Sequence, residues 1–94
     1  MYVDEDQFRL AGEAQRKKLR EYAKRLRIEP FLGDRIPRQQ IPRRFQDLQN
    51  LFRLELPQGW RALYTVASRP GFGSQIRVVW IGDHTRYNRL FGYH

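Results

Sequence analysis

The sequence predicts an α+β domain, with N-terminal helices packed on one face of a small antiparallel β-sheet and a short C-terminal segment, helical or irregular. One observation is the length of 94 residues with 40% hydrophobic residues, which suits a single compact domain. Another is that the two halves of the sequence differ. The first half has apolar residues at helical spacing with charged residues between them, and the second half has alternating apolar residues. We therefore expect one domain over 1–94, helical in 4–48, a β-meander in 51–82 and a C-terminal segment in 83–94.

The first half is predicted to be helical because its core-facing positions recur every three to four residues. These positions are Phe8, Ala11, Gln15, Leu19, Tyr22, Ala23 and Leu26. Asp4 and Asp6 stand where an N-cap and a first-turn anion belong, and Pro30 followed by Gly33 ends the helix. The positions between are mostly basic, which fits either a solvated face or a contact surface for an acidic partner.

The segment "IPRQQIPRRFQDL" is ambiguous because two Ile-Pro pairs interrupt it. Each proline can open a short helix at its first position. We expect one short helix or turn after Pro42, running through Phe45 toward Leu48.

Three strands are predicted in the second half, from "LFRLEL", "WRALYTV" and "QIRVVWIG". The residues "PQG" suit a tight turn between the first two, and "ASRPGFGS" is a longer loop before the third. A register that pairs Leu56 with Trp60 and Val66 with Ile76 gives one entirely apolar or aromatic face. That face, which we expect the helices to cover, comprises Phe52, Leu54, Leu56, Trp60, Ala62, Tyr64, Val66, Ile76, Val78 and Trp80.

The opposite face of the predicted sheet mixes arginines with aliphatic residues. It receives Arg53, Glu55, Arg61, Leu63, Thr65, Arg77, Val79 and Ile81. Glu55 falls opposite Arg61, which is a favourable cross-strand pair. Because an antiparallel sheet can leave one face open, these arginines either cover apolar surface with their stems or form a phosphate-binding cleft.

The charge of the chain points to a polyanionic partner, since the formal net charge is +8 at pH 7. Lys17, Lys18 and Lys24 are the only lysines among the 18 basic residues. Arginine suits both phosphate binding and base stacking. A genome-wide preference for arginine or an acidic protein partner would give the same balance.

The composition also excludes several kinds of site. With no cysteine, disulfides and thiolate metal sites are excluded, and we expect no metal and no cofactor. No apolar run approaches the ~20 residues that span a bilayer, and "MYVDEDQF" lacks the apolar segment of a signal peptide. A cytoplasmic protein with no membrane contact is the expectation.

The stretch "GDHTRYNRLFGYH" follows the third strand and lies beside Arg61 in the predicted register. His84 and Tyr87 are three residues apart, so on a helical turn they would share a face. They are the proton-transfer groups with reach to Arg61 and Glu55, and histidine titrates near neutral pH. The stretch is either a plain cap on the sheet or part of a catalytic site.

The order of these blocks resembles the RelE/ParE superfamily of bacterial and archaeal toxins. The resemblance covers roughly residues 8–94 and rests on "NLFRLELPQGWRALYTV", "IRVVWIGDH" and "RYNRLFGY". Archaeal-type RelE-like mRNA interferases are the most similar members. The resemblance implies an endoribonuclease fold without a metal, and an acidic antitoxin protein that holds the toxin inactive.

The resemblance also implies roles for individual residues. Arg61, in "GWRALY", matches the arginine of the family's second sheet strand, and His84 and Tyr87 match C-terminal residues of several active nucleases. Glu55 and Arg53 are looser matches. Two features depart from the family: only "MYV" stands where a first strand is usual, and lysines that some members place in the active site are absent.

On this interpretation the chain is the toxin of a type II toxin–antitoxin pair and cuts mRNA on the ribosome by transesterification. A base takes the 2′-OH proton, the oxygen attacks the adjacent phosphorus, and the 5′-oxygen leaves with a proton. Arg61 would stabilise the charge on the phosphorane, and Tyr87 would stack on a base or orient the nucleotide. His84 and Glu55 would serve as acid and base, in an order that the sequence leaves open.

The predicted catalytic residues are thus Arg61, His84, Tyr87 and Glu55, and the predicted RNA-binding residues are Arg53, Arg77, Arg86, Arg89, Lys17 and Lys18. Arg53 or Arg77 would assist Arg61. Two other functions stay open, because family membership does not decide activity. One is a ParE-like or degenerate toxin that binds its antitoxin and a protein target such as gyrase without cutting RNA. The other is a small RNA- or DNA-binding module with no enzymatic role.

Overall fold

The computed structural model describes residues 1–92, so Tyr93 and His94, which we expected to tolerate substitution, lie outside the described residues. The helices of this part are α1 (Glu5–Leu10), α2 (Glu13–Leu26) and α3 (His84–Phe91), with 3-10 turns η1 (Arg38–Gln40), η2 (Arg43–Phe45) and η3 (Pro57–Gly59). The strands are β1 (Tyr2–Val3), β2 (Asp34–Arg35), β3 (Phe52–Glu55), β4 (Arg61–Arg69) and β5 (Gly73–Gly82).

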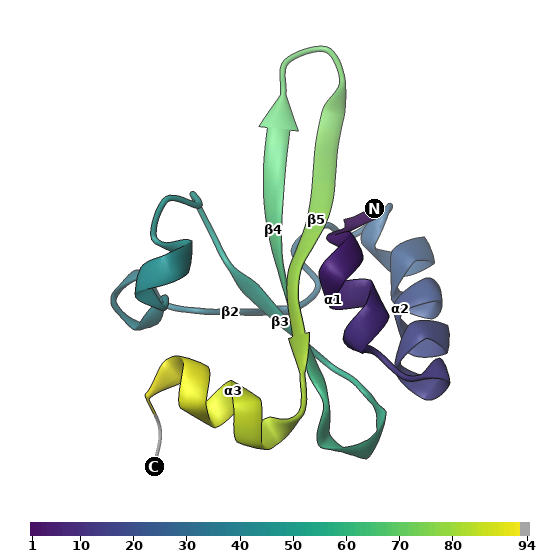
Figure 1. Cartoon of the computed structure of the whole chain (residues 1–94). Coiled ribbons are helices and arrows are strands. Elements are labelled where there is room, and N and C mark those ends of the chain that lie inside the picture. Colours follow the sequence, from purple (N-terminus) through teal and green to yellow (C-terminus); the bar gives the residue numbers. More distant parts are fainter. Residues whose placement is uncertain (93–94) are drawn as a thin grey trace.

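Within residues 1–92 the strands form one five-stranded sheet in the order β1-β5-β4-β3-β2 (Figure 1). The β3–β4–β5 meander and β2 pair antiparallel, and β1 pairs parallel with β5. The predicted fold class, α+β with helices on a mostly antiparallel sheet, is confirmed. The short N-terminal segment does form a strand, although it spans only Tyr2–Val3.

The predicted helical region is shorter than expected and is divided in two. Gly12 separates α1 from α2, with extended backbone at Ala11 and Gly12, and helix α2 ends at Leu26. The helix end predicted at Pro30 and Gly33 lies a few residues beyond the observed end, and the rest of the region to residue 48 forms β2 and two 3-10 turns. The expected short turn after Pro42 is one of these two. Asp4 is the N-cap of α1 by position, but its carboxylate makes no cap hydrogen bond and pairs with Arg77 instead.

Helices α1 and α2 cover one face of the sheet and bury the first core cluster (Figure 1). Two buried glutamines join the helices to the strands. Gln7 Oε1 accepts the backbone N–H of Ile81 at 2.9 Å, beyond the point where β1 stops pairing with β5. Gln15 Nε2 donates to the Pro57 carbonyl at 3.2 Å. Both buried amides are thereby hydrogen-bonded, as buried polar groups usually are.

A β-bulge in β5 changes which side chains reach each face. The pairs Val66–Ile76 and Glu55–Arg61 are confirmed, but Leu63 pairs with Trp80 and Tyr64 with Val78, so Val79 is an extra residue. The prediction that Trp80 lies with the helix-covered face is therefore wrong, and so is the opposite placement of Ile81. Trp80 packs in the second cluster and Ile81 in the first.

The second face of the sheet, which an antiparallel sheet can leave open, is largely covered. Segment 36–51 and helix α3 lie on this side, across the sheet from α1 and α2 (Figure 1). They bury a second cluster, which consists of Ile36, Ile41, Phe45, Leu51, Leu63, Val79, Trp80 and Tyr87. The arginines of this face lie at the rim of this cluster. None of the helices in the described part of the chain is long and apolar enough to cross a membrane.

Candidate active site

An ion-paired cluster joins β3 to the start of β4. Arg61 Nε lies 3.4 Å from one carboxylate oxygen of Glu55, and Arg53 Nε lies 3.3 Å from the other. The cross-strand pairing of Glu55 with Arg61 places these groups together. The side chains of Arg61 and Arg53 are 25% and 31% exposed, and Glu55 is 55% exposed. Two guanidinium groups therefore flank one carboxylate that solvent and ligands can reach.

Asp34 of β2 extends this cluster at the sheet edge. Its Oδ2 accepts a hydrogen bond from Arg53 Nη2 at 3.0 Å. Burial opposes the charge on Arg53, but hydrogen bonds with Tyr87 and Asp34 outweigh it and raise the pKa of this guanidinium. The Nε atoms of Arg53 and Arg61 are buried and form ion pairs with Glu55 at angles too poor for hydrogen bonds. The positive charge of Arg53 is thus stabilised, while the Nε donor of each arginine is left weakly satisfied.

Tyr87 of α3 forms the wall against which the two arginines pack. The Cζ atoms of Arg61 and Arg53 lie 4.7 and 5.9 Å from the centroid of its ring. Its hydroxyl is 3.5 Å from Arg53 Nη1, and Trp80 meets its ring edge-on at 6.0 Å between centroids. The residue is only 3% exposed. Stacking of this ring on an RNA base would require α3 to move, so the ring supports the arginines in the described state.

The start and end of helix α3 are defined by local sequence. Asp83 is the N-cap, and its side chain accepts the backbone N–H of Arg86 at 2.9 Å. Gly92 ends the helix in the left-handed conformation, with φ of 75°. Before the helix, β5 ends at Gly82, where an added Cβ would lie 2.6 Å from the Trp80 ring. These residues hold α3 against Trp80 and so place Tyr87 over the arginines.

His84 is exposed at the first turn of α3 and does not share the buried position of Tyr87. Its Nδ1 is near the β3–β4 turn, 3.5 Å from the point where a Cβ on Gly59 would lie. Among residues 1–92 it makes no hydrogen bond or ion pair with Arg61 or Glu55. The structure thus brings Arg61, Glu55 and Tyr87 together and leaves His84 beside them, at the turn.

The predicted RNA-binding residues divide into separate groups. Arg53 belongs to the cluster around Glu55. In the strand register Arg77 lies opposite Thr65, further along the β4–β5 ladder than Arg61. Its guanidinium donates two hydrogen bonds to the Asp4 carboxylate, at 2.8 and 3.0 Å. The hydrogen bonds and charge of Asp4 raise the pKa of Arg77. Arg77 is therefore not placed to assist Arg61.

The remaining predicted groups lie on two different helices. Lys17 and Lys18 are on α2, on the side of the sheet away from Tyr87, and Lys18 lies 3.5 Å from Glu21. Arg86 and Arg89 are on the exposed side of α3. These two arginines share helix α3 with Tyr87.

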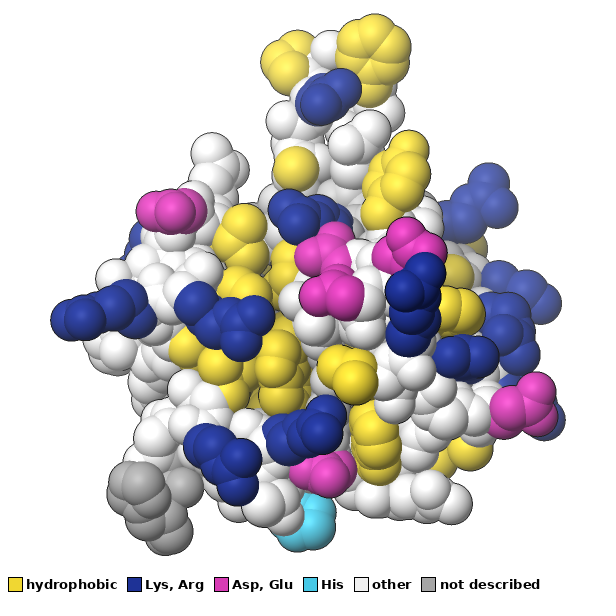
Figure 2. Space-filling view, in the orientation of Figure 1, with side chains coloured by type: hydrophobic (Ala, Val, Ile, Leu, Met, Phe, Trp, Pro, Cys, Tyr) yellow, Lys and Arg dark blue, Asp and Glu magenta, His cyan; other side chains and the backbone are white. Residues whose placement is uncertain are grey.

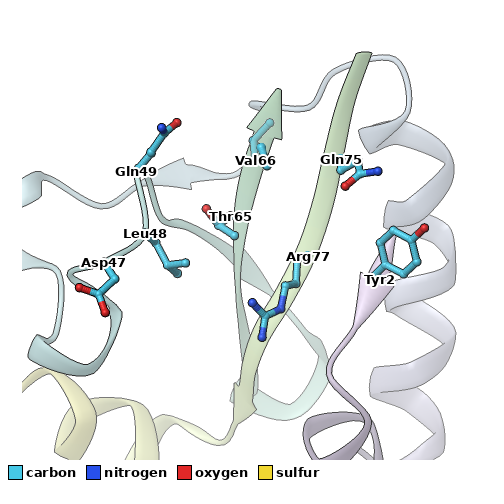
Figure 3. A pocket seen from close by; sticks show the side chains of 9 residues that line it. Tyr2, Asp47, Leu48, Gln49, Thr65, Val66, Gln75 and Arg77 are labelled. Carbon is cyan, nitrogen blue, oxygen red and sulfur yellow. The ribbon is translucent and has the colours of Figure 1, made fainter. Parts of the chain in front are cut away.

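A groove of about 500 Å³ lies further along the second face (Figure 3). Asp47, Leu48 and Gln49 form one side, and Thr65 of β4 with Arg77 of β5 belongs to the other. Because Arg77 is paired with Asp4, the groove lacks an unpaired cation. It is mostly apolar and separate from the Arg61 cluster, and we assign no catalytic role to it.

Two residues near the candidate site, Asp34 and Arg44, were not predicted from the sequence. Asp34 lies in a two-residue strand, which is too short to show an alternation pattern, and the sequence indicated only a turn at the neighbouring Gly33. Arg44, which lines a pocket beside α3, comes from the 3-10 turn after Pro42. Within residues 1–92 no group of three or more His, Asp or Glu side chains is placed to hold a metal ion. Comparison with protein-family models, curated proteins and solved structures finds no match, so the functional argument rests on the fold and the cluster.

Proposed function

We propose that the chain is the toxin of a type II toxin–antitoxin pair and that it cleaves mRNA on the ribosome, in the cytoplasm, without a metal. The observation that supports this proposal is the Arg61–Glu55–Arg53 cluster beside Tyr87. The net charge of +8 favours RNA as the substrate and an acidic protein as the antitoxin. The resemblance to RelE-like sequences supplies the reaction class.

The cluster has the charge distribution that transesterification at a phosphate needs. Glu55 occupies the position between two guanidinium groups, where a phosphate would be equally well held. If an RNA phosphate displaces this exposed carboxylate, Arg61 and Arg53 are left to stabilise the negative charge of the phosphorane. Glu55 then lies next to the bound phosphate and can accept the 2′-OH proton. Tyr87 keeps both arginines in place from below.

The test is cleavage of mRNA by the purified chain in the presence of translating ribosomes, mapped by primer extension. Arg61→Ala should abolish the cleavage products, and Arg20→Ala, which removes one exposed arginine of α2, should leave them unchanged. Both variants lose one positive charge, so a difference between them isolates the cluster from the overall charge. Equal cleavage by the wild type and Arg61→Ala would disprove the proposed site, and no cleavage by the wild type would disprove the activity.

A second candidate is a toxin that binds its antitoxin and a protein target such as gyrase without cutting RNA. The observation in its favour is that Tyr87 is buried and His84 lies at the β3–β4 turn, so the cluster holds few groups for proton transfer. Inhibition of gyrase supercoiling by a chain that leaves ribosome-bound mRNA intact would identify this function. Binding of RNA or DNA without either activity would instead identify a non-enzymatic module.

A further inference from the structure

A second basic site lies on the outer side of α3, apart from the Arg61 cluster. A pocket of about 310 Å³ forms between α1, η2, the end of β5 and α3. It is lined by Gln7, Leu10, Arg44, Trp80, Ile81, Arg86, Arg89 and Leu90. Figure 2 shows basic side chains around an apolar patch in this part of the surface, near the exposed histidine.

Three exposed arginines from different elements converge on this pocket. Arg44 comes from η2, and Arg86 and Arg89 come from α3. Within residues 1–92 none of the three forms an ion pair, whereas Arg53, Arg61 and Arg77 are all paired with carboxylates. Arg44 lies over the Phe45 ring, with its Cζ 5.0 Å from the ring centroid. The pocket therefore gathers positive charge that no acidic side chain of residues 1–92 neutralises.

The floor of the pocket is apolar and well held. Trp80 and Ile81 belong to the buried end of β5, on either side of the sheet beyond the bulge. The backbone N–H of Ile81 is already bonded to Gln7 Oε1, so the strand edge offers no free donor here. A ligand in this pocket would meet cations at the rim and carbon atoms below, which matches a phosphate joined to a sugar and base.

We propose that this pocket binds one phosphate, with its attached nucleoside, of a single RNA strand that also contacts Arg61. The proposal rests on the proposed function, because it takes RNA as the ligand. Helix α3 connects the two sites: Tyr87 faces the Arg61 cluster, and Arg86 and Arg89 face the pocket. Trp80 contributes to both, since it lines the pocket and packs edge-on against Tyr87.

The dimensions and donors favour RNA over an acidic peptide. About 310 Å³ is at the small end of the range for small-molecule sites, which suits one nucleotide better than a peptide strand or helix. Guanidinium groups match phosphate with paired donors, and phosphate contacts are the common way in which proteins position a nucleic-acid strand. An acidic peptide remains the alternative that the experiment has to separate.

The experiment measures binding of a short fluorescent 2′-O-methyl oligouridylate, which cannot be cleaved because its 2′ oxygens are blocked. Affinity is followed against salt concentration for the wild type and three variants. The first carries Arg44→Ala, Arg86→Ala and Arg89→Ala, and the second carries lysine at the same three positions. The matched control, with Arg20→Ala, Lys24→Ala and Arg69→Ala, loses the same charge from exposed residues without ion pairs in the described range. Thermal melting of each variant checks folding.

The expected result is about tenfold weaker binding, or more, for the triple alanine variant, with partial retention by the lysine variant and near wild-type binding by the control. The slope of log K against log salt should fall by about 0.7 for each phosphate that the variant no longer neutralises. Equal losses in the alanine and control variants would show a general charge effect and overturn the proposal. The proposal would also be overturned if poly-glutamate displaced the labelled oligonucleotide as effectively as an unlabelled oligonucleotide does.

Cleavage of ribosome-bound mRNA by the same variants separates this proposal from the proposed function. If the wild type cleaves mRNA and the triple alanine variant binds and cleaves equally well, the proposed RNA binding at the pocket is overturned. The proposed nuclease activity is then left intact. Wild-type chain that binds RNA through the pocket but never cleaves it would support the pocket and disprove the nuclease.

Discussion

The guanidinium of Arg61 lies over the ring of Tyr87, with its Cζ 4.7 Å from the ring centroid. This contact joins the first residue of β4 to the middle of α3, so the C-terminal helix supports the arginine that we place at the scissile phosphate. A cation over an aromatic face contributes about 0.5–1 kcal/mol at exposed sites and more where water is excluded. The C-terminal stretch therefore combines the two roles considered for it. Tyr87 packs on the sheet as a cap would, and it also positions Arg61.

Arg61→Ala should lower mRNA cleavage by about 10²-fold or more, in line with the loss of one group that stabilises transition-state charge. Its free energy of unfolding should fall by less than about 1 kcal/mol from the lost ion pair, because Glu55 is more than half exposed. Cleavage rates on translating ribosomes and urea unfolding followed by circular dichroism give the two values. A cleavage loss that appears only together with unfolding would remove Arg61 from the mechanism.

Tyr87→Phe and Tyr87→Ala should behave very differently. Phenylalanine keeps the ring beneath Arg61 and removes the hydroxyl, whose contact with Arg53 is weak, so stability should change by no more than about 1 kcal/mol. Alanine leaves a cavity between Trp80, Phe91 and the arginines and should cost about 3–5 kcal/mol. Thermal unfolding of both variants is the measurement. Equal stability of the two would mean that Tyr87 is not packed as described.

His84→Ala should lower cleavage by about 10–10³-fold if this histidine transfers a proton. Its melting temperature should not change, because the side chain is exposed at the start of α3. The adjacent Thr85→Ala removes a neighbouring exposed polar group and is the matched control. Wild-type rates in both variants would leave Glu55 as the proton-transfer group of the cluster.

Gly33→Ala should destabilise the fold by about 1–3 kcal/mol, because the new Cβ would meet rigid neighbours. It would lie 2.7 Å from the Arg53 carbonyl oxygen and 2.8 Å from the Tyr64 ring. Gly12→Ala is the comparison, since its Cβ would meet only the far end of the Gln15 side chain, at 2.7 Å. Chemical denaturation should therefore give a smaller loss at Gly12. Similar losses at both positions would contradict the close packing of Gly33.

Tyr64→Phe should change the response of the fold to alkaline pH. The Tyr64 hydroxyl donates to the Pro30 carbonyl at 2.9 Å and accepts the Gly33 N–H at 2.8 Å. Burial raises the pKa of this phenol, so the unfolded chain ionises first and stability falls as pH rises above about 10. Removing the hydroxyl should cost about 1–3 kcal/mol at neutral pH and flatten the alkaline decline. Melting temperatures from pH 8 to 11 would show whether the two slopes differ.

Much of the sheet was predictable because every second residue of β3, and of β4 as far as Val66, is apolar or aromatic. The pairing of Glu55 with Arg61 follows from a tight turn at "PQG" and needs no tertiary information. The error at Trp80 has a specific cause. A β-bulge adds one residue to one strand, and an apolar run such as "VVWI" contains no polar residue that would reveal the change of face.

The candidate site was predictable in its residue types but less so in its arrangement. Proximity of Tyr87 to Arg61 follows from strand order, whereas burial of Tyr87 depends on segment 36–51 closing the second face. That segment has no helical or strand periodicity, and its position depends on where Ile36, Ile41 and Phe45 find apolar partners. For the same reason Arg44 could not be joined to Arg86 and Arg89 from sequence alone.

The pairing of Tyr2 with Arg77 also sets the order in which the molecule can fold. Strand β1 and the Asp4–Arg77 ion pair need β5, which is synthesised after both helices, so α1 and α2 emerge before the sheet that they cover is complete. Contacts between such distant segments slow folding, because a long loop must close before they form. The Arg61–Tyr87 contact likewise waits for α3. A growing chain therefore carries its basic helices well before it carries an assembled arginine cluster, because the cluster is complete only once α3 has been synthesised.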